Sequence, residues 1–100
     1  MILVSATAQA RPEKRNELAG RLAGTAAASR NDPGCLGYRF YADVEDPTRF
    51  ASVETWTDRA SHDAHMGAAH VVALLAVLGD LVTQAPVITV HEVASSSTYG

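Results

Sequence analysis

The stretch "GYRFYADVEDPTRFASVETW", Gly37–Trp56, decides the fold because it contains two β-rich runs joined by a short polar turn. Aromatic and β-branched residues favour strands, and the Asp and Pro of "EDPT" favour a turn between them. We assume that the two runs pair as a hairpin in which the numbers of paired residues add up to a constant even sum. One face of the hairpin then carries alternate side chains from both strands. These are Tyr38, Phe40, Ala42 and Val44 on the first strand and Phe50, Ser52, Glu54 and Trp56 on the second.

Two more strands and two helical regions flank this hairpin. Residues 2–10 and 87–93 have strand character. An amphipathic helix with a thin, Ala-rich apolar face is predicted from Pro12 to about Arg30. A second helical region begins at the capping pair Thr57-Asp58, is broken near Gly67 and ends before residue 86. The order β-α-β-β-α-β predicts an α+β, ferredoxin-like fold, one antiparallel sheet with both helices on one face.

Length and composition restrict the possibilities further. One hundred residues with 47% hydrophobic content suit one domain, which we expect to span residues 1–94, followed by a flexible tail at 95–100. Eight Lys and Arg against eleven Asp and Glu leave no basic excess for nucleic acid. No apolar run approaches the roughly 18 residues of a membrane-spanning helix, so no membrane partner is expected. The start lacks a basic signal-peptide region, and the lone Cys35 suits a reducing cytoplasm.

Both faces of the predicted hairpin carry bulky apolar residues. Tyr41 and Val53 lie on the face opposite Phe40 and Trp56. In a monomer this second face would be exposed, and large exposed apolar patches usually mark a contact with a partner. We therefore expect a homodimer whose two sheets pack face to face.

Three of the four histidines fall within "VETWTDRASHDAHMGAAHV", Val53–Val71. On a regular helix His62 and His65 are neighbours, whereas His70 lies about 140° around the axis from His65. Three ligands on one continuous helix are therefore excluded, although a break at Gly67 could swing His70 back. Neither HExxH nor a Cys/His spacing is present, so we predict no metal site. His62 is expected to be a solvated surface residue.

Glu54 shares its predicted strand face with Trp56 and Phe50. If that face meets the helices, the carboxylate is partly buried, and a buried carboxylate needs a partner or a raised pKa. A structural ion pair and a functional group both satisfy this requirement. Both interpretations stay open at the level of sequence.

Three motifs resemble the antibiotic-biosynthesis monooxygenase (ABM) domain family. They are "PGCLGY" at residues 33–38, "VETWTD" at 53–58 and "AHMGAAH" at 64–70. They match the family's Gly-x-x-Gly-aromatic strand start, its Glu-x-Trp, and a His five residues before another His. The resemblance implies a dimeric α+β barrel with a mostly apolar pocket in each subunit. Known members oxidise aromatic polyketides to quinones with dioxygen and without flavin or metal, and relatives degrade haem or process small quorum signals.

Carried over by position, Trp56 resembles the pocket tryptophan and His65 the helix histidine that faces it, while Glu54 and His70 match the other signature positions. The resemblance implies oxidation of a small or polycyclic phenol or hydroquinone by dioxygen, with no cofactor. Trp56, His65 and Glu54 are then the expected catalytic group, and a flat substrate would lie between the first two. The expected substrate-binding residues are Tyr38, Phe40, Ser52, Thr7 and His70.

The chemistry suits these residue types. A phenol must lose a proton before it passes an electron to dioxygen, and histidine, with an unperturbed pKa of about 6.5, is a suitable base. Tryptophan can stack on a flat ring or donate its N–H to a carbonyl oxygen.

Two alternatives remain. Haem-degrading relatives carry an asparagine on the first strand where this chain has Thr7, which disfavours haem degradation but leaves haem binding through His65 open. The other alternative is a non-enzymatic, dimeric ligand-binding or accessory module, favoured if side chains fill the pocket.

Overall fold

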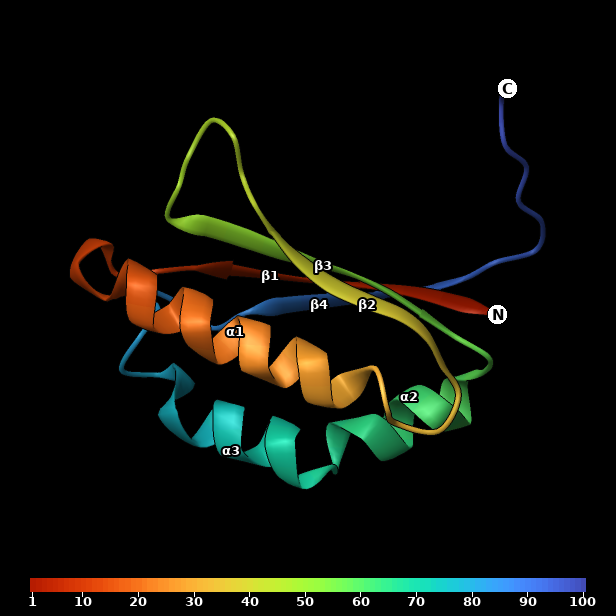
Figure 1. Cartoon of the computed structure of the whole chain (residues 1–100), viewed down its shortest axis with the longest axis horizontal. Helices are drawn as coiled ribbons and strands as arrows, with labels where there is room; N and C mark the ends of the chain where they lie inside the picture. Colours follow the sequence, from red (N-terminus) through yellow and green to blue (C-terminus); the bar gives the residue numbers. More distant parts are fainter.

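One four-stranded antiparallel sheet and the helices on one of its faces make up the computed structural model, which describes residues 1–100. The strands lie in the order β2-β3-β1-β4, and Figure 1 shows α1 and α3 side by side beneath them. This is the α+β, ferredoxin-like fold predicted from the order of elements. In chain order the elements are β1 (Ile2–Gln9), the short 3-10 helix η1 (Pro12–Lys14), α1 (Arg15–Ser29), β2 (Cys35–Ala42), β3 (Arg49–Trp56), α2 (Arg59–Met66), α3 (Ala69–Leu78) and β4 (Val87–Glu92).

The pairing of β2 with β3 follows the predicted even-sum register. Tyr38 pairs with Glu54 and Phe40 with Ser52, and the register shifts only at the start of β2, between Cys35 and Gly37. The two faces of the hairpin differ in burial. Tyr38 faces the helices and is 6% exposed, whereas Tyr41 on the other face is 55% exposed. The predicted apolar bare face is therefore confirmed as a feature of the single chain.

Helix α1 lies close to the sheet because its inner face is built from leucine and small residues. Leu18, Leu22 and Ala26 are almost fully buried on that face. The two leucines join Ala8, Phe50 and Leu78 in one core cluster, and Ala26 joins a second one around Trp56. Full burial of a leucine-sized side chain stabilises a fold by about 1.5–3 kcal/mol, so this narrow stripe accounts for the attachment of the helix. No helix combines the length and apolar character that crossing a bilayer requires.

The turn between α1 and β2 places Asp32 beside α2. Cys35 N donates to Asp32 O at 3.1 Å, with Pro33 and Gly34 as the central residues. Gly34 has φ +82°, as the third position of a type II turn requires. Thr57 N donates to Gly34 O at 2.9 Å and attaches the turn to the end of β3.

The second helical region is two helices, as the sequence predicted. The Asp58 carboxylate caps α2 by accepting from Ser61 N at 2.8 Å. Gly67 ends α2, and Ala68 has extended backbone angles (φ −66°, ψ 148°) before α3 begins. This break turns the chain so that the rings of His65 and His70 lie 5.9 Å apart, instead of on different sides of one helix.

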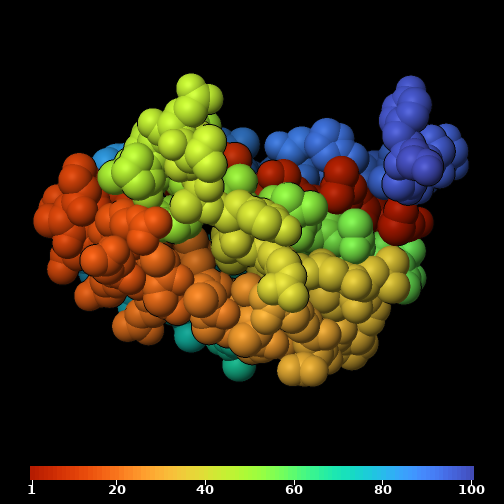
Figure 2. All heavy atoms as spheres, turned by 45° about the horizontal axis from the view of Figure 1, so that its top comes forward, coloured from red at the N-terminus to blue at the C-terminus, as the bar shows by residue number.

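The chain after β4 has no regular secondary structure. Figures 1 and 2 show these last residues, in dark blue, leading away from the sheet. The predicted tail at 95–100 lies within this segment.

Candidate functional site

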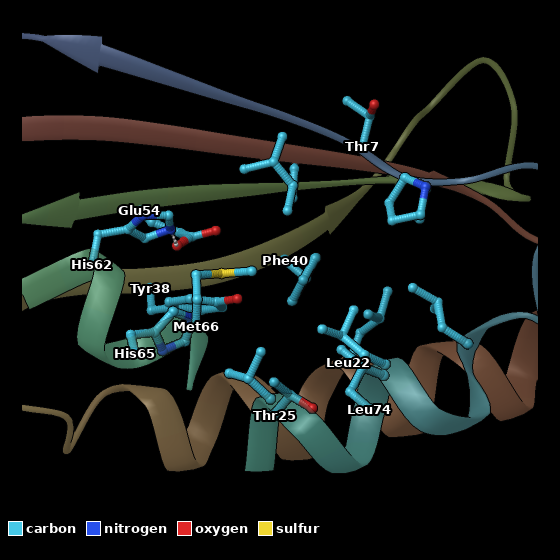
Figure 3. Close-up of a pocket in the computed structure, with 17 residues that line it drawn as sticks. Thr7, Leu22, Thr25, Tyr38, Phe40, Glu54, His62, His65, Met66 and Leu74 are labelled. Carbon is cyan, nitrogen blue, oxygen red and sulfur yellow. Dashed lines mark ion pairs between the residues drawn. The ribbon is translucent and has the colours of Figure 1, made fainter. Parts of the chain in front are cut away.

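A cavity of about 60 Å³ lies between the sheet and the helices. Seventeen residues line it and 11 of them are hydrophobic, so most of its wall is apolar. Figure 3 shows that the polar side chains are not spread evenly, because Glu54, His62, His65 and Tyr38 gather at one end. The cavity therefore has a polar end under β2 and β3 and an apolar body between α3, β1 and β4.

Glu54 is held at the polar end by neutral donors. Its side chain is almost fully buried; Oε1 accepts from Trp56 Nε1 at 3.1 Å and Oε2 accepts from Ser52 Oγ at 2.6 Å. Ser52 Oγ in turn accepts from Ala6 N at 2.8 Å, which ties the chain of hydrogen bonds to β1. The partners that a buried carboxylate needs are thus present. They come from its own strand and not from a permanent cation.

The prediction that His62 is a surface residue is wrong. Its residue exposure is 5%, its Nε2 lies 3.9 Å from Glu54 Oε1, and its ring centroid is 5.8 Å from that of Trp56. The cause is the position of α2, which covers Trp56 so that residues three apart on the helix, His62 and His65, both face inward. Burial lowers the pKa of His62 below its ordinary value, and the Glu54 charge opposes this only in part.

His65 packs against the aromatic side chains of the hairpin. Its ring centroid lies 4.6 Å from that of Trp56 and 5.4 Å from that of Tyr38. The two rings of Trp56 and His65 are in contact, so the expectation that a flat substrate lies between them is wrong. The space open to a ligand is the cavity on the other side of His65, which the histidine lines and the tryptophan does not.

Asp32 orients His65 from behind. His65 Nδ1–H donates to Asp32 Oδ2 at 2.8 Å, because a carboxylate oxygen can only accept. In the neutral imidazole this leaves Nε2 as a hydrogen-bond acceptor. His70 Nε2–H donates to the same Asp32 oxygen at 2.9 Å. Sequence reasoning missed Asp32, since its position in "NDPGC" indicated only a turn and no spacing links it to residues 33 and 38 positions later.

Tyr38 supplies a hydroxyl group at the polar end. Burial, and then the negative charge of Glu54, raise the pKa of Tyr38 well above its ordinary value. The phenol therefore stays protonated and can donate a hydrogen bond. Of the two tyrosines on β2 it was the one expected to face the pocket, and that prediction is confirmed.

The structure separates the expected site residues into two groups. Glu54, His65, Tyr38 and Phe40 line the cavity. Thr7 borders it too, but Ala6 and Ala8 on either side face the cavity, so the Thr7 side chain points to the other side of the sheet (Figure 3). Residues that stand behind the lining and do not reach the cavity are Trp56, Ser52 and His70.

Other lining residues were not singled out from the sequence, among them Thr25 of α1 and Met66 at the end of α2. For Met66 a signal existed, because it adjoins the Gly67 break where the chain must bend over the sheet. Thr25 lies on the buried face of α1 between Leu22 and Ala26, and only the apolar periodicity of that helix could have pointed to it.

The fold places the chain in the class of small α+β, ferredoxin-like domains. Residues 1–77 match the family model described as antibiotic biosynthesis monooxygenase, and the chain is a member of that family. The resemblance noted in the three sequence motifs is thereby confirmed.

The chain is also similar to several solved structures and to one curated protein. A candidate antibiotic biosynthesis monooxygenase of Deinococcus radiodurans is 27% identical, with a TM-score of 0.94 over 100% of this chain and 99% of that one. A Mycobacterium tuberculosis protein is 25% identical, with a TM-score of 0.90 over 97% of this chain and 98% of that one. An uncharacterised protein of Synechocystis sp. is 27% identical over 97% of this chain. The chain spans only 66% of the length of that relative.

Proposed function

We propose that this protein is a cofactor-independent monooxygenase that converts a small phenol or hydroquinone to a quinone with dioxygen. The observation that carries the proposal is that one cavity combines a mostly apolar wall with a polar end. At that end lie His65, oriented by its hydrogen bond to Asp32, and the buried carboxylate of Glu54. The apolar character of the wall suits an aromatic ring, and the hydroxyl group of that ring would meet the polar end. Membership of the monooxygenase family supports the reaction class.

The first step is removal of the phenolic proton. His65 Nε2 accepts it, and Asp32 stabilises the resulting imidazolium through the Nδ1–H hydrogen bond. The Tyr38 hydroxyl, which stays protonated, donates a hydrogen bond to the phenolate oxygen. Glu54 and Trp56 act indirectly. The tryptophan N–H donates to the Glu54 carboxylate and fixes it, and the indole ring packs against His65 and supports it. They are positioning residues in this scheme.

The oxidation needs no outside reductant. A phenol with a free para carbon and one dioxygen give one quinone and one water, and a hydroquinone with a free ring carbon gives one hydroxyquinone and one water. In both cases the substrate supplies all four electrons. The phenolate carbon passes electrons to dioxygen and forms a C–O bond. The O–O bond then breaks, and the departing oxygen leaves as water with the proton that His65 returns and the proton from the ring carbon. A mostly apolar lining limits the access of water and so protects the anion during these steps.

The volume of the cavity limits the size of the substrate. An apolar cavity of about 150 Å³ holds benzene, whereas this one measures about 60 Å³. A single ring can enter only if flexible lining residues such as Met66 and Leu75 move outward, which an unbranched methionine does readily. A polycyclic substrate or haem would require far larger movements. The proposed substrate is therefore a single-ring phenol or hydroquinone.

The proposed assembly is a homodimer through the bare sheet face. Tyr41, Val53 and Val87 are each about half exposed there. Their burial against a second copy would remove apolar surface from water, which favours association.

Oxygen uptake tests the proposed reaction. Tag-free protein treated with a chelator is mixed with substituted phenols and hydroquinones, and oxygen consumption and quinone absorbance are followed together. We expect turnover that falls at least about 100-fold in His65→Gln, as for loss of a general base. Arg21→Gln, on the exposed face of α1, serves as the control and keeps full activity. Equal rates for the wild type and His65→Gln would refute the role of His65.

A second candidate is a ligand-binding module without catalysis, and the small cavity favours it. In that case the same phenols raise the melting temperature of the protein in a concentration-dependent way, while no quinone forms. Quinone formation above the rate of the buffer excludes this candidate.

A further inference from the structure

The cluster of Asp32, His65 and His70 lies behind the cavity and is only partly used by the proposed chemistry. We propose that these three residues form a binding site for a divalent first-row transition metal such as Zn²⁺. Each offers one ligand atom, Oδ2, Nδ1 and Nε2 respectively, and the three atoms all lie within 4.8 Å of one another. The prediction that the chain has no metal site considered histidines and cysteines alone and did not include Asp32.

The donor set and its spacing suit such an ion. Two imidazole nitrogens and one carboxylate oxygen are ligands that Zn²⁺, Fe²⁺ and Co²⁺ accept, with positions left for water. Ligand atoms around Zn²⁺ stand about 3 Å apart because each lies about 2 Å from the metal. The Asp32 oxygen is already 2.8 Å from His65 Nδ1 and 2.9 Å from His70 Nε2. The two histidine nitrogens lie within 4.8 Å of each other, so binding of an ion requires the imidazole rings to move to about 3 Å spacing around it.

The charge at the cluster also favours a cation. The Asp32 side chain is 17% exposed, and its ion-pair partners within 4.0 Å are the two imidazoles, which carry no permanent charge. A divalent ion would neutralise this partly buried carboxylate. The His70 side chain is 25% exposed, against 2% for His65, so an ion can enter from solvent on the His70 side.

The surrounding structure holds the three ligands in place before any ion binds. The type II turn at residues 32–35 fixes Asp32, and the rings of Trp56 and Tyr38 fix His65. The break between α2 and α3 brings His70 to the same point. Three separate segments therefore converge on one position, which no single helix could achieve with these spacings.

Metal binding would change what His65 presents to the cavity. A metal on Nδ1 requires that nitrogen to be free of hydrogen, so in the neutral ring the hydrogen moves to Nε2. The nitrogen proposed to accept the substrate proton would become a donor, and the loaded protein would lose its base. This consequence rests on the proposed function, whereas the metal site itself does not.

Isothermal titration of the tag-free, chelator-treated protein with ZnCl₂ tests the site. We expect one Zn²⁺ per chain, and binding at least about tenfold weaker in Asp32→Asn and His70→Gln, since even partners outside the ligand set cost about 10–100-fold. His91→Gln removes an exposed histidine elsewhere and keeps the wild-type affinity. Circular dichroism establishes that each variant is folded. If Asp32→Asn is unfolded, the more exposed His70→Gln decides.

Nitrogen NMR of the histidine rings provides the second measurement. Zn²⁺ is expected to shift the Nδ1 signal of His65 and the Nε2 signal of His70, and to leave His91 unchanged. The alternative is that Asp32, His65 and His70 form only a hydrogen-bonded triad, which has the same geometry but no affinity for a metal ion. Absence of binding at micromolar Zn²⁺, or equal affinity in the wild type, Asp32→Asn and His70→Gln, would overturn the proposal in favour of that triad.

Discussion

Trp56 and Glu54, two residues apart on β3, are joined by the indole N–H, which donates to Glu54 Oε1 at 3.1 Å. The family motif Glu-x-Trp is therefore one physical unit in this chain, because alternation along the strand puts both side chains on the helix-facing side. Ser52, two residues earlier, completes the unit from its other end. The tryptophan is fully buried and stands behind His65, so it supports the site without reaching the cavity.

Replacing the tryptophan separates its hydrogen bond from its bulk. Trp56→Phe keeps an aromatic ring but leaves the buried carboxylate short of one donor, which we expect to cost about 1–3 kcal/mol in the free energy of unfolding. Trp56→Ala also opens a void and should cost about 3–5 kcal/mol. Urea denaturation measures both. Equal costs for the two variants would show that the bulk of the side chain adds little beyond the hydrogen bond, whereas an unchanged stability in Trp56→Phe would show that the hydrogen bond contributes little.

Buried His62 should make stability depend on pH. Its pKa is lowered in the folded chain, mainly by burial, so the unfolded chain binds the proton more tightly. Stability is then greatest above the ordinary histidine pKa of about 6.5 and falls as pH falls through that value towards the lower folded pKa. Urea midpoints of the wild type and His62→Gln at pH 7.5 and 5.5 test this. The drop between the two pH values should be smaller in the variant.

Two glycines are expected to respond in opposite ways to alanine. At Gly34, where φ is +82°, an added Cβ would lie 2.2 Å from Ser61 Oγ and 2.5 Å from Ser61 Cβ. Gly34→Ala should therefore destabilise the protein by more than the roughly 1–2 kcal/mol of a left-handed backbone alone. Gly24, within α1, has nothing within 4 Å of its added Cβ. Gly24→Ala should stabilise the helix by about 0.5–1 kcal/mol. Thermal melting measures both, and stabilisation by Gly34→Ala would contradict the turn geometry.

A charge on the bare sheet face should separate the proposed dimer. Val53 is 49% exposed in the single chain, so Val53→Asp leaves the monomer fold nearly unchanged while placing two carboxylates in the interface. Sedimentation equilibrium at micromolar concentration should give about twice 10.6 kDa for the wild type and about 10.6 kDa for the variant. Arg21→Asp, on the outer face of α1, is the matched control and stays dimeric. A wild-type mass of one chain would refute the dimer.

The sequence was sufficient for features that depend on local pattern. Strand alternation placed Tyr38 and Glu54 on one face, and the glycine at 67 located the break between α2 and α3. Sequence reasoning failed where the environment of a residue depends on segments that are distant in the chain. His62 was expected on the surface, yet it is buried because the end of β3, with Trp56, lies beneath it. Asp32 was beyond reach, since only the folded turn brings it to two histidines far along the chain.

The cluster of Asp32, His65 and His70 depends on the break at Gly67 and Ala68, although neither of these two residues contributes a side chain to it. Replacing Gly67 by alanine, beside the alanine already at 68, would favour one uninterrupted helix from α2 into α3. In such a rod His70 would turn away from His65 by about 140°. A mutation that improves helix formation here would thus dismantle the meeting point of three side chains while leaving every one of them intact.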